Sequence, residues 1–371
     1  MKIAYVYDAV YPWENGGIQK RVWELARRLS DNHDVHWYGL RYWDGPTVYE
    51  RDGVTLHGIA DPPNLYVNGR RSISEALFFG AHLARPLLRG EFDVIDCQAF
   101  PYFSCFPSKL GAVTRGATLF VTWHEVWMAY WREYLGRKGV FGEAIESVVA
   151  RLPDEHITVS ERTRRDLDAI GAPHSHLVPN GIAMDTVRAA PATTEPIDIL
   201  FVGRLIEEKN VDLLVRAVAM MRETVPDVHC HVVGDGPERA ALESQIADFG
   251  LEEYVTMLGF REKHEEILGL MKTADVFVLP SRREGFGITA LEALACGTPV
   301  VTIDHPQNAA AALIEDSESG YVTNATPEAV ADATLAARTD ISPETCTTAA
   351  EGYEWDAIAR QAETVYEEAS T

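Results

Sequence analysis

Short apolar runs alternate along this chain with segments whose apolar residues recur at helical spacing. Such alternation is typical of parallel β-sheets whose strands are joined by crossover helices. In the first half it predicts strands at Lys2–Tyr7, Asp34–Tyr38, Val54–Ile59, Asp93–Cys97, Thr118–Thr122, His156–Val159 and His176–Val178. Between them it predicts helices at Ile18–Leu29, Ser72–Leu88, Pro101–Leu110, Phe141–Ala150 and Glu161–Ile170.

The same alternation restarts in the second half. It predicts strands at Ile197–Val202, Val228–Val233, Val255–Leu258, Val276–Leu279 and Pro299–Ile303, and helices at 209–223, 237–248, 262–273 and 288–296. The intervening Ala189–Pro196 has the composition of a linker. We therefore expect an α/β protein with two Rossmann-like, doubly wound parallel sheets facing across a cleft. The expected domains are 1–188 and 189–352, and a C-terminal helix at 353–371 is expected to cross back toward the first domain.

Composition narrows the function classes. A formal net charge of −23 repels nucleic acid, so a nucleic-acid partner is excluded. Arg outnumbers Lys and acidic residues are in surplus, which suggests a salt-rich, halophilic cytoplasm where charge repulsion is screened. The five cysteines form no Cys-x-x-Cys pair, and Met1–Tyr7 is too short and polar for a signal peptide. We expect a cytoplasmic protein.

The most informative motif follows the apolar run Val276–Pro280. Glu284 and Glu292 are separated by seven residues, with Gly285, Phe286 and Gly287 after the first. Glycines let backbone N–H groups approach a ligand, and the N-terminus of the following helix favours phosphate oxygens. Carboxylates accept hydrogen bonds from hydroxyl groups. The pattern favours a diphosphate held between two polyols, although a solvated helix face with two acids is the simpler alternative.

Two cations follow the first strand of the second half. Arg204 lies in the expected loop and Lys209 begins the next helix, a combination suited to a diphosphate. The alternative is that Lys209 pairs with Glu207 or Glu208 on the surface. Gly234, in Gly-Asp-Gly-Pro after the next strand, marks a turn that could line a nucleotide.

The first half offers fewer candidates. Gly16 and Gly17 precede a helix and could wrap a ligand between the domains, but the third glycine of a dinucleotide motif is missing. His124 follows a strand, so it either faces the cleft or is an ordinary core histidine. His174-Ser-His176 and His229-Cys-His231 lack the carboxylate or cysteine partners of a metal site. Neither a metal nor a cofactor is expected.

In their order and spacing, these residues resemble the retaining glycosyltransferases of family 4, which have the GT-B fold. The resemblance also includes Val178-Pro-Asn-Gly-Ile and Tyr353-Glu-Trp. It implies that Arg204 and Lys209 bind the donor diphosphate, that Glu284 contacts the transferred sugar and that Glu292 holds the ribose hydroxyls. It also implies front-face transfer of a hexose from a nucleoside-diphosphate sugar to a hydroxyl acceptor without a metal. The alternatives are a sugar-nucleotide epimerase and a non-catalytic nucleotide-sugar-binding subunit.

The acceptor is expected to be a glycan or a lipid-linked molecule in lipid-linked or cell-surface glycan synthesis. Tyr66–Arg89 combines Arg70, Arg71, Arg85 and Arg89 with apolar residues. This segment is either a peripheral contact with the cytoplasmic membrane face or an ordinary crossover helix with solvated arginines. The aromatic residues Trp127, Tyr130, Trp131 and Tyr134 either stack on sugar or fill the core.

Overall fold

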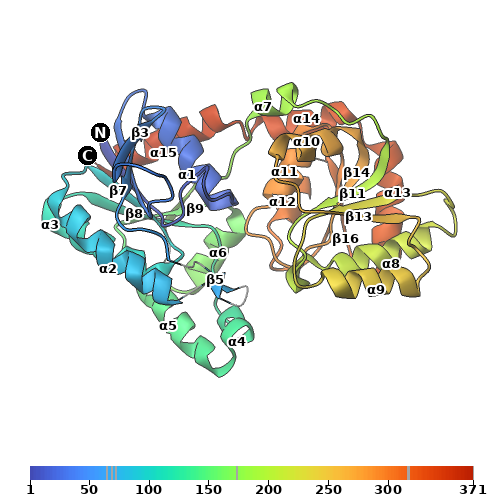
Figure 1. The fold of residues 1–371 in the computed structure, drawn as a ribbon, viewed down its shortest axis with the longest axis horizontal. Helices are drawn as coiled ribbons and strands as arrows, with labels where there is room; N and C mark the ends of the chain where they lie inside the picture. Colours follow the sequence, from blue (N-terminus) through green and yellow to red (C-terminus); the bar gives the residue numbers. More distant parts are fainter. Residues whose placement is uncertain (64–65, 68–69, 72, 173, 316–317, 371) are drawn as a thin grey trace. The chain divides into compact units, whose positions relative to one another are not determined.

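A computed structural model describes residues 1–371 except 64–65, 68–69, 72, 173, 316–317 and 371. The chain forms two compact units (Figure 1). Unit 1 comprises Met1–Gly181 and Trp355–Thr371, and unit 2 comprises Ile182–Glu354. Each unit is built on a mainly parallel sheet with helices packed on it, as the alternation of strand and helix patterns predicts.

The sheet of unit 1 has, within the described residues, the strand order β10-β9-β8-β7-β1-β2-β4-β3. All neighbours pair in parallel except the edge pair β3–β4. The strands are β1 Lys2–Val6, β2 Asp34–Gly39, β3 Val48–Arg51, β4 Val54–Gly58, β7 Val94–Gln98, β8 Thr118–Trp123, β9 Glu155–Thr158 and β10 Ser175–Leu177. A separate hairpin joins β5 Tyr66–Val67 to β6 Arg70–Arg71.

The helices of unit 1 arise where apolar residues recur at i, i+3 and i+4. In α1, for example, Val22, Leu25 and Leu29 are buried against the sheet. The helices are α1 Gly17–Leu29, α2 Ile73–Arg89, η1 Tyr102–Ser104, α3 Cys105–Arg115, α4 Tyr130–Leu135, η2 Gly136–Lys138, α5 Gly139–Val149, α6 Glu161–Ala169 and α15 Trp355–Ala369. The expected helix at Pro101–Leu110 is instead the 3-10 turn η1 followed by α3.

Unit 2 has an all-parallel sheet of order β13-β12-β11-β14-β15-β16 in the part of the chain that is described. Its strands are β11 Ile197–Val202, β12 Cys230–Val233, β13 Val255–Gly259, β14 Ala274–Leu279, β15 Val300–Ile303 and β16 Gly320–Thr323. Its helices are α7 Met184–Ala189, η3 Glu207–Lys209, α8 Val211–Met221, α9 Arg239–Asp248, α10 His264–Thr273, α11 Ile288–Ala295, α12 Ala310–Glu315, α13 Pro327–Asp340 and α14 Pro343–Glu351.

The boundary between the units differs from the one that composition indicated. It lies at Gly181–Ile182, upstream of the Ala189–Pro196 segment. That segment is tied into unit 2, because the Lys272 ammonium on α10 donates to the backbone carbonyl of Ala190 at 2.6 Å. The second crossing is at Glu354–Trp355, close to the expected 352–353.

The C-terminal helix α15 belongs to unit 1. Its Tyr366 is fully buried, and the ring lies edge-on to Phe120 of β8 with centroids 5.0 Å apart. The Tyr366 hydroxyl donates to Asp96 of β7 at 2.6 Å. A buried aromatic ring and a buried hydrogen bond therefore fix this helix onto the sheet of unit 1.

Candidate functional site

In unit 2, the loops that follow β11 and β14 begin at the same edge of the sheet. These two strands are neighbours, and the order of the sheet reverses between them. Parallel sheets of this kind bind ligands beyond the carboxyl ends of the strands at such a reversal. The two loops are joined there, since the Arg282 N–H donates to Glu208 O at 2.8 Å and the Asn210 side-chain amide donates to Pro280 O at 3.1 Å.

An ion pair between Lys209 and Glu284 links these loops. The side chains are 19% and 11% exposed, so the pair is largely shielded from water. The Glu284 backbone is fixed by two hydrogen bonds, from its N–H to Gln307 O at 2.9 Å and from the Ala309 N–H to its carbonyl at 3.0 Å. The structure thus brings together the cation from the first loop and the acid from the second. Lys209 pairs with this distant acid rather than with either neighbouring glutamate.

Glycines shape the loops around this pair. Gly234 has φ +139°, and a Cβ there would collide with the carbonyl oxygen of Gly203. The Gly203 N–H donates to Val233 O at 3.0 Å, so the loops after β11 and β12 are in direct contact. Arg204 is exposed on the first of these loops. The two loops can pack this closely only because Gly234 lacks a side chain.

The turn that leads into α11 has a similar requirement. Gly287 is the N-cap residue with φ +96°, and a Cβ would come within 2.6 Å of the Ala310 side chain. Phe286 is 8% exposed, and its ring contacts Tyr353 with centroids 5.8 Å apart. The Phe286 side chain therefore packs inside unit 2, and only the backbone of Gly285–Gly287 remains to meet a ligand.

Glu292 lies on α11 and faces the neighbouring helix α10. Its carboxylate is hydrogen-bonded to His264 Nε2 at 2.8 Å, and its side chain is 7% exposed. The sequence did not single out His264, which starts α10 and is distant along the chain. Glu292 is therefore a nearly buried acceptor that already has His264 as a partner, rather than part of a solvated helix face.

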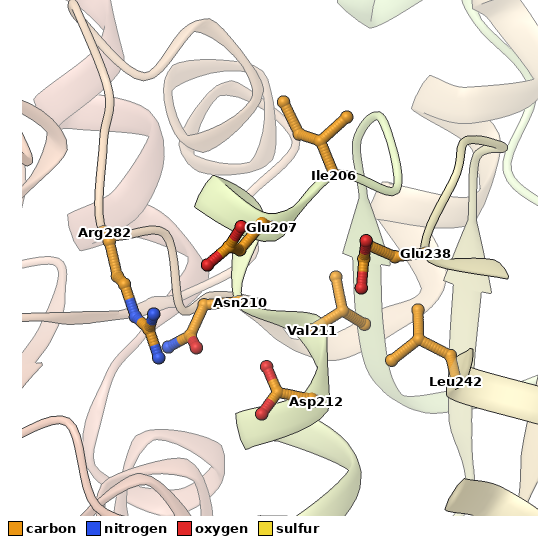
Figure 2. A pocket seen from close by; sticks show the side chains of 8 residues that line it. All are labelled: Ile206, Glu207, Asn210, Val211, Asp212, Glu238, Leu242 and Arg282. Atoms are coloured by element: carbon orange, nitrogen blue, oxygen red, sulfur yellow. The ribbon is translucent and has the colours of Figure 1, made fainter. Parts of the chain in front are cut away.

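A cavity of about 290 Å³ lies beside the β11–α8 connection (Figure 2). Glu207, Asp212 and Glu238 contribute carboxylates to its lining, and Arg282 contributes the one guanidinium seen there. Three carboxylates disfavour a diphosphate by charge repulsion. This cavity is therefore a poor candidate for the phosphate site, and the Lys209–Glu284 side of the connection is the better one.

In unit 1, His124 directly follows β8 and is half-buried. Its Nε2 lies 2.8 Å from Gln98 Oε1, and the Gln98 amide donates to Asp96 at 3.1 Å. Because the Gln98 amide nitrogen is used in this way, its oxygen faces the histidine and Nε2 carries the proton. Burial, assisted by the charge of Arg21, lowers the pKa of His124 to about 3. His124 is therefore neutral at physiological pH, with Nδ1 left as an acceptor.

The chain Tyr366–Asp96–Gln98 that orients His124 was not apparent from the sequence. Burial raises the pKa of Asp96, and its Oδ1 also accepts from the Thr122 hydroxyl at 2.7 Å. Gln98 and Thr122 are opposite one another in the register of β7 and β8. Only strand pairing across the sheet brings these residues together.

Gly16 and Gly17 lie in unit 1 at the start of α1, whose first residue is Gly17. Gly16 is extended and serves as the N-cap residue of α1, where no side chain caps the helix. Both glycines are exposed, which leaves their backbone accessible. The aromatic residues after His124 pack on one another: the Trp127 and Trp131 rings lie 4.6 Å apart, and Trp131 is 7% exposed.

Across the residues that the structure describes, no helix combines the length and apolar character needed to cross a bilayer.

Comparison with known proteins identifies two family models along the chain. A model described as Glycosyltransferase Family 4 matches residues 15–186, and one described as Glycosyl transferases group 1 matches residues 185–351. A GDP-mannose-dependent alpha-(1-6)-phosphatidylinositol dimannoside mannosyltransferase of Mycobacterium tuberculosis is 30% identical over 230 residues. That alignment covers 59% of this chain and 58% of the relative. The 2-deoxystreptamine glucosyltransferase of Streptomyces kanamyceticus is 36% identical over 172 residues, or 42% of this chain and 44% of that protein.

Solved structures resemble the whole chain. Sucrose-phosphate synthase from Thermosynechococcus elongatus has a TM-score of 0.79 at 20% identity and covers 99% of this chain and 98% of that chain. Alr3699/HepE of Anabaena in complex with UDP has a TM-score of 0.76 at 20% identity, with coverage of 99% and 100%. At this identity the likeness concerns the fold, and it confirms the expected GT-B fold with two Rossmann-like domains.

Proposed function

We propose that this chain, which belongs to the family-4 glycosyltransferases, transfers a hexose from a nucleoside-diphosphate sugar to a hydroxyl acceptor with retention of configuration. The aligned part spans about 58% of the mannosyltransferase it matches, so the activity of that relative enters here only as support. The observation that carries the proposal is the shielded Lys209–Glu284 pair where the strand order of unit 2 reverses.

The pair suits a nucleotide sugar because its members bind different parts of such a ligand. In the proposed complex the Lys209 ammonium, together with Arg204, binds the diphosphate, and Glu284 accepts hydrogen bonds from hydroxyls of the transferred sugar. The backbone of Gly285–Gly287 and the N-terminus of α11 add donors to phosphate oxygens. Glu292 accepts hydrogen bonds from the two ribose hydroxyls, with His264 holding its carboxylate in place.

We propose front-face transfer because the acids of the site are assigned to hydroxyl groups rather than to attack on the anomeric carbon. The bond from the anomeric carbon to the phosphate oxygen breaks, and the acceptor oxygen bonds to that carbon from the same face. The acceptor proton passes to the departing phosphate oxygen. Arg204 and Lys209 stabilise the charge that develops on the leaving diphosphate. His124, neutral and with Nδ1 free to accept, holds a sugar hydroxyl.

This mechanism requires neither a metal nor a cofactor, because side chains and backbone amides supply the positive charge. Full activity in excess chelator is the expected result, and a loss that added Mg²⁺ restores would contradict this part of the proposal. The proposed setting is glycan synthesis at the cytoplasmic face of a membrane. The phosphatidylinositol-based name of the mycobacterial relative supports a lipid-linked acceptor.

Peripheral membrane contact through the Tyr66–Arg89 segment is part of this setting. Ile73 and Leu77 of α2 are 58% and 50% exposed, and the apolar groups are accompanied by Arg85 and Arg89. The side chains of Arg70 and Arg71, and Ser72, lie outside the described residues. Salt-dependent sedimentation with anionic vesicles tests the contact. Stability that rises with KCl concentration is the corresponding expectation for a halophilic cytoplasmic protein.

The first experiment measures the thermal stability of the chain in the presence of candidate donors. GDP-mannose and UDP-glucose lead the panel, since the former appears in the name of the mycobacterial relative and the latter in a HepE complex. A donor at 100 times its Kd should stabilise the chain by about 2.7 kcal/mol. Incubating that donor alone then separates the alternatives. A new sugar nucleotide would indicate an epimerase, and binding without product across an acceptor panel would indicate a non-catalytic subunit.

A further inference from the structure

Unit 1 contains an apolar cavity of about 630 Å³ lined by residues of α2, η1, α4 and α5, of which Figure 1 labels α2, α4 and α5. Its size lies within the range of small-molecule sites. Aromatic and aliphatic side chains form most of the lining, including Phe100, Phe103, Tyr134 and Leu135. Among the described lining residues polar atoms are few, and the Lys138 ammonium is the one formal charge.

The cavity adjoins the loop that carries His124. Phe100, which lines the cavity, stacks on Trp127 with ring centroids 5.5 Å apart and an interplanar angle of 18°. Trp127 is three residues after His124. The apolar space therefore begins next to the loop of His124, the residue to which the proposed function assigns a sugar hydroxyl.

A buried carboxylate fixes this wall of the cavity. Glu146 is 1% exposed and accepts hydrogen bonds from the N–H groups of Trp127 and Met128, both at 2.7 Å. It also accepts one from the hydroxyl of Tyr102, at 2.6 Å, whose side chain lines the cavity. Three hydrogen bonds to one buried acid hold the His124 loop and the cavity wall as a single rigid element.

The lining selects among ligands by chemistry. A sugar would leave its hydroxyl groups without partners against so apolar a surface, which is costly. A hydrocarbon chain gains free energy from each methylene that it buries there. At the rim, Phe141 is 70% exposed beside Lys138, so an apolar surface meets a cation on a chain of net charge −23. This combination fits an amphiphile with a hydrocarbon chain and an anionic phosphate head.

We infer that this cavity binds the hydrocarbon chain of a lipid phosphate acceptor, with Lys138 pairing with the phosphate and the acceptor hydroxyl directed toward His124. The inference rests on the proposed function for the identity of the ligand as an acceptor. It goes beyond surface adsorption to a membrane, since it requires a single chain to enter the protein. Its binding test is independent of turnover.

Calorimetry with hexyl, octyl and decyl phosphate, each below its micelle concentration, tests the inference on the full chain. Affinity should rise roughly fourfold per added CH₂, with a negative heat-capacity change. Lys138→Ala should weaken binding of decyl phosphate several-fold while leaving that of the neutral decanol unchanged. Binding that does not depend on chain length would overturn the inference.

Two variants locate the binding. Phe141→Asp puts a negative charge at the rim, which repels the negative phosphate head. It should weaken the binding of decyl phosphate at least tenfold. Phe249→Asp changes another exposed phenylalanine, 47% exposed in unit 2, and should leave binding unchanged. Equal loss or equal retention in both variants would place the alkyl phosphate elsewhere, and uptake seen only with vesicles would indicate a membrane surface instead.

Measuring the binding of nucleoside diphosphates to wild type and to the same variants tests this inference separately from the proposed function. Phe141→Asp should leave that binding intact, because the residues proposed to bind the diphosphate and the ribose belong to unit 2. If decyl phosphate binds as expected while every nucleotide fails, the cavity assignment stands and the glycosyltransferase proposal does not. If nucleotides bind and alkyl phosphates fail in the wild-type chain, the cavity assignment is wrong.

Discussion

The Lys209 ammonium and the Glu284 carboxylate are paired across two loops that are 75 positions apart in sequence. Both side chains are largely shielded from solvent, so each reduces the cost of burying the other. In the proposed complex the same two groups must instead face a diphosphate and a sugar. In the proposed function, the ion pair therefore forms in the absence of the donor and must break when the donor binds.

The first prediction follows from this competition. Glu284→Gln removes the charge that neutralises Lys209 and repels phosphate. The variant should bind nucleoside diphosphate as tightly as wild type or several-fold more tightly, while transfer falls at least 100-fold. Lys209→Ala should weaken the binding of the nucleoside diphosphate at least tenfold. Calorimetry and a transfer assay measure both effects.

Arg216→Ala is the matched control for Lys209→Ala, since Arg216 pairs with Asp212 on the exposed face of α8. It should leave nucleotide affinity and transfer unchanged. Weaker nucleotide binding in Glu284→Gln, together with retained transfer, would contradict the division of roles between Lys209 and Glu284.

A second prediction concerns Glu292. If the Glu292 carboxylate accepts hydrogen bonds from both ribose hydroxyls, the affinity for the nucleotide should fall when these hydroxyls are removed. Wild type should bind the 2′,3′-dideoxy nucleoside diphosphate at least tenfold more weakly than the parent compound, because hydrogen bonds to a charged group each contribute about 1.5–3 kcal/mol. In Glu292→Ala the two ligands should bind within about twofold of one another.

Glu243→Ala provides the comparison for that cycle, because Glu243 is an exposed partner of Arg239 on α9. It should preserve the full difference between the two nucleotides. If Glu292→Ala also preserves it, Glu292 does not contact the ribose, and its bond to His264 serves the packing of α10 on α11.

A third prediction concerns acid stability. Burial lowers the pKa of His57 and His156 to about 4 and that of His124 to about 3. Between the ordinary histidine pKa of about 6.5 and these values, the unfolded chain binds protons that the folded chain does not. The contribution of these histidines to the free energy of unfolding is therefore complete above pH 6.5 and is lost as pH falls toward 4, at up to about 1.4 kcal/mol per pH unit for each histidine.

Urea unfolding of wild type and His156→Gln between pH 7 and 4.5 checks this sign. Glutamine can accept the bond that His156 Nδ1 receives from the Trp123 indole at 3.0 Å. In this variant the slope of the unfolding free energy against pH should be smaller than in wild type, by the amount that corresponds to about one bound proton.

A fourth prediction concerns the contact between the loops after β11 and β12. Gly234→Ala combines a positive φ with a collision against Gly203 O, so we expect a loss of roughly 2–4 kcal/mol in unfolding free energy. Gly250→Ala also has a positive φ, at +62°, but no atom lies within 4 Å of the added Cβ. It should cost only about 1 kcal/mol. Equal costs would show that backbone conformation, and not the loop contact, requires the glycine.

Local sequence patterns predicted most strands of both sheets because buried parallel strands appear as short apolar runs. The run Ile197–Val202 coincides with β11, and its buried face needs no partner to be recognised. The edge strands β10 and β13 were predicted, whereas the other two edge strands, β3 and β16, were not. β3 is mostly exposed, and β16 is half-buried throughout, so neither carries a strong apolar signal.

What the sequence alone determined is the alternation of strand and helix, the loops that carry Arg204, Lys209 and Glu284, and the helix that carries Glu292, since loop glycines, strand ends and helical spacing are local features. The tertiary structure decided the pairings: Lys209 with Glu284, Glu292 with His264, and His124 with Gln98. It also decided that α7 joins unit 2 and that α15 joins unit 1. These contacts depend on which strands lie side by side, and spacing along the chain does not contain that information.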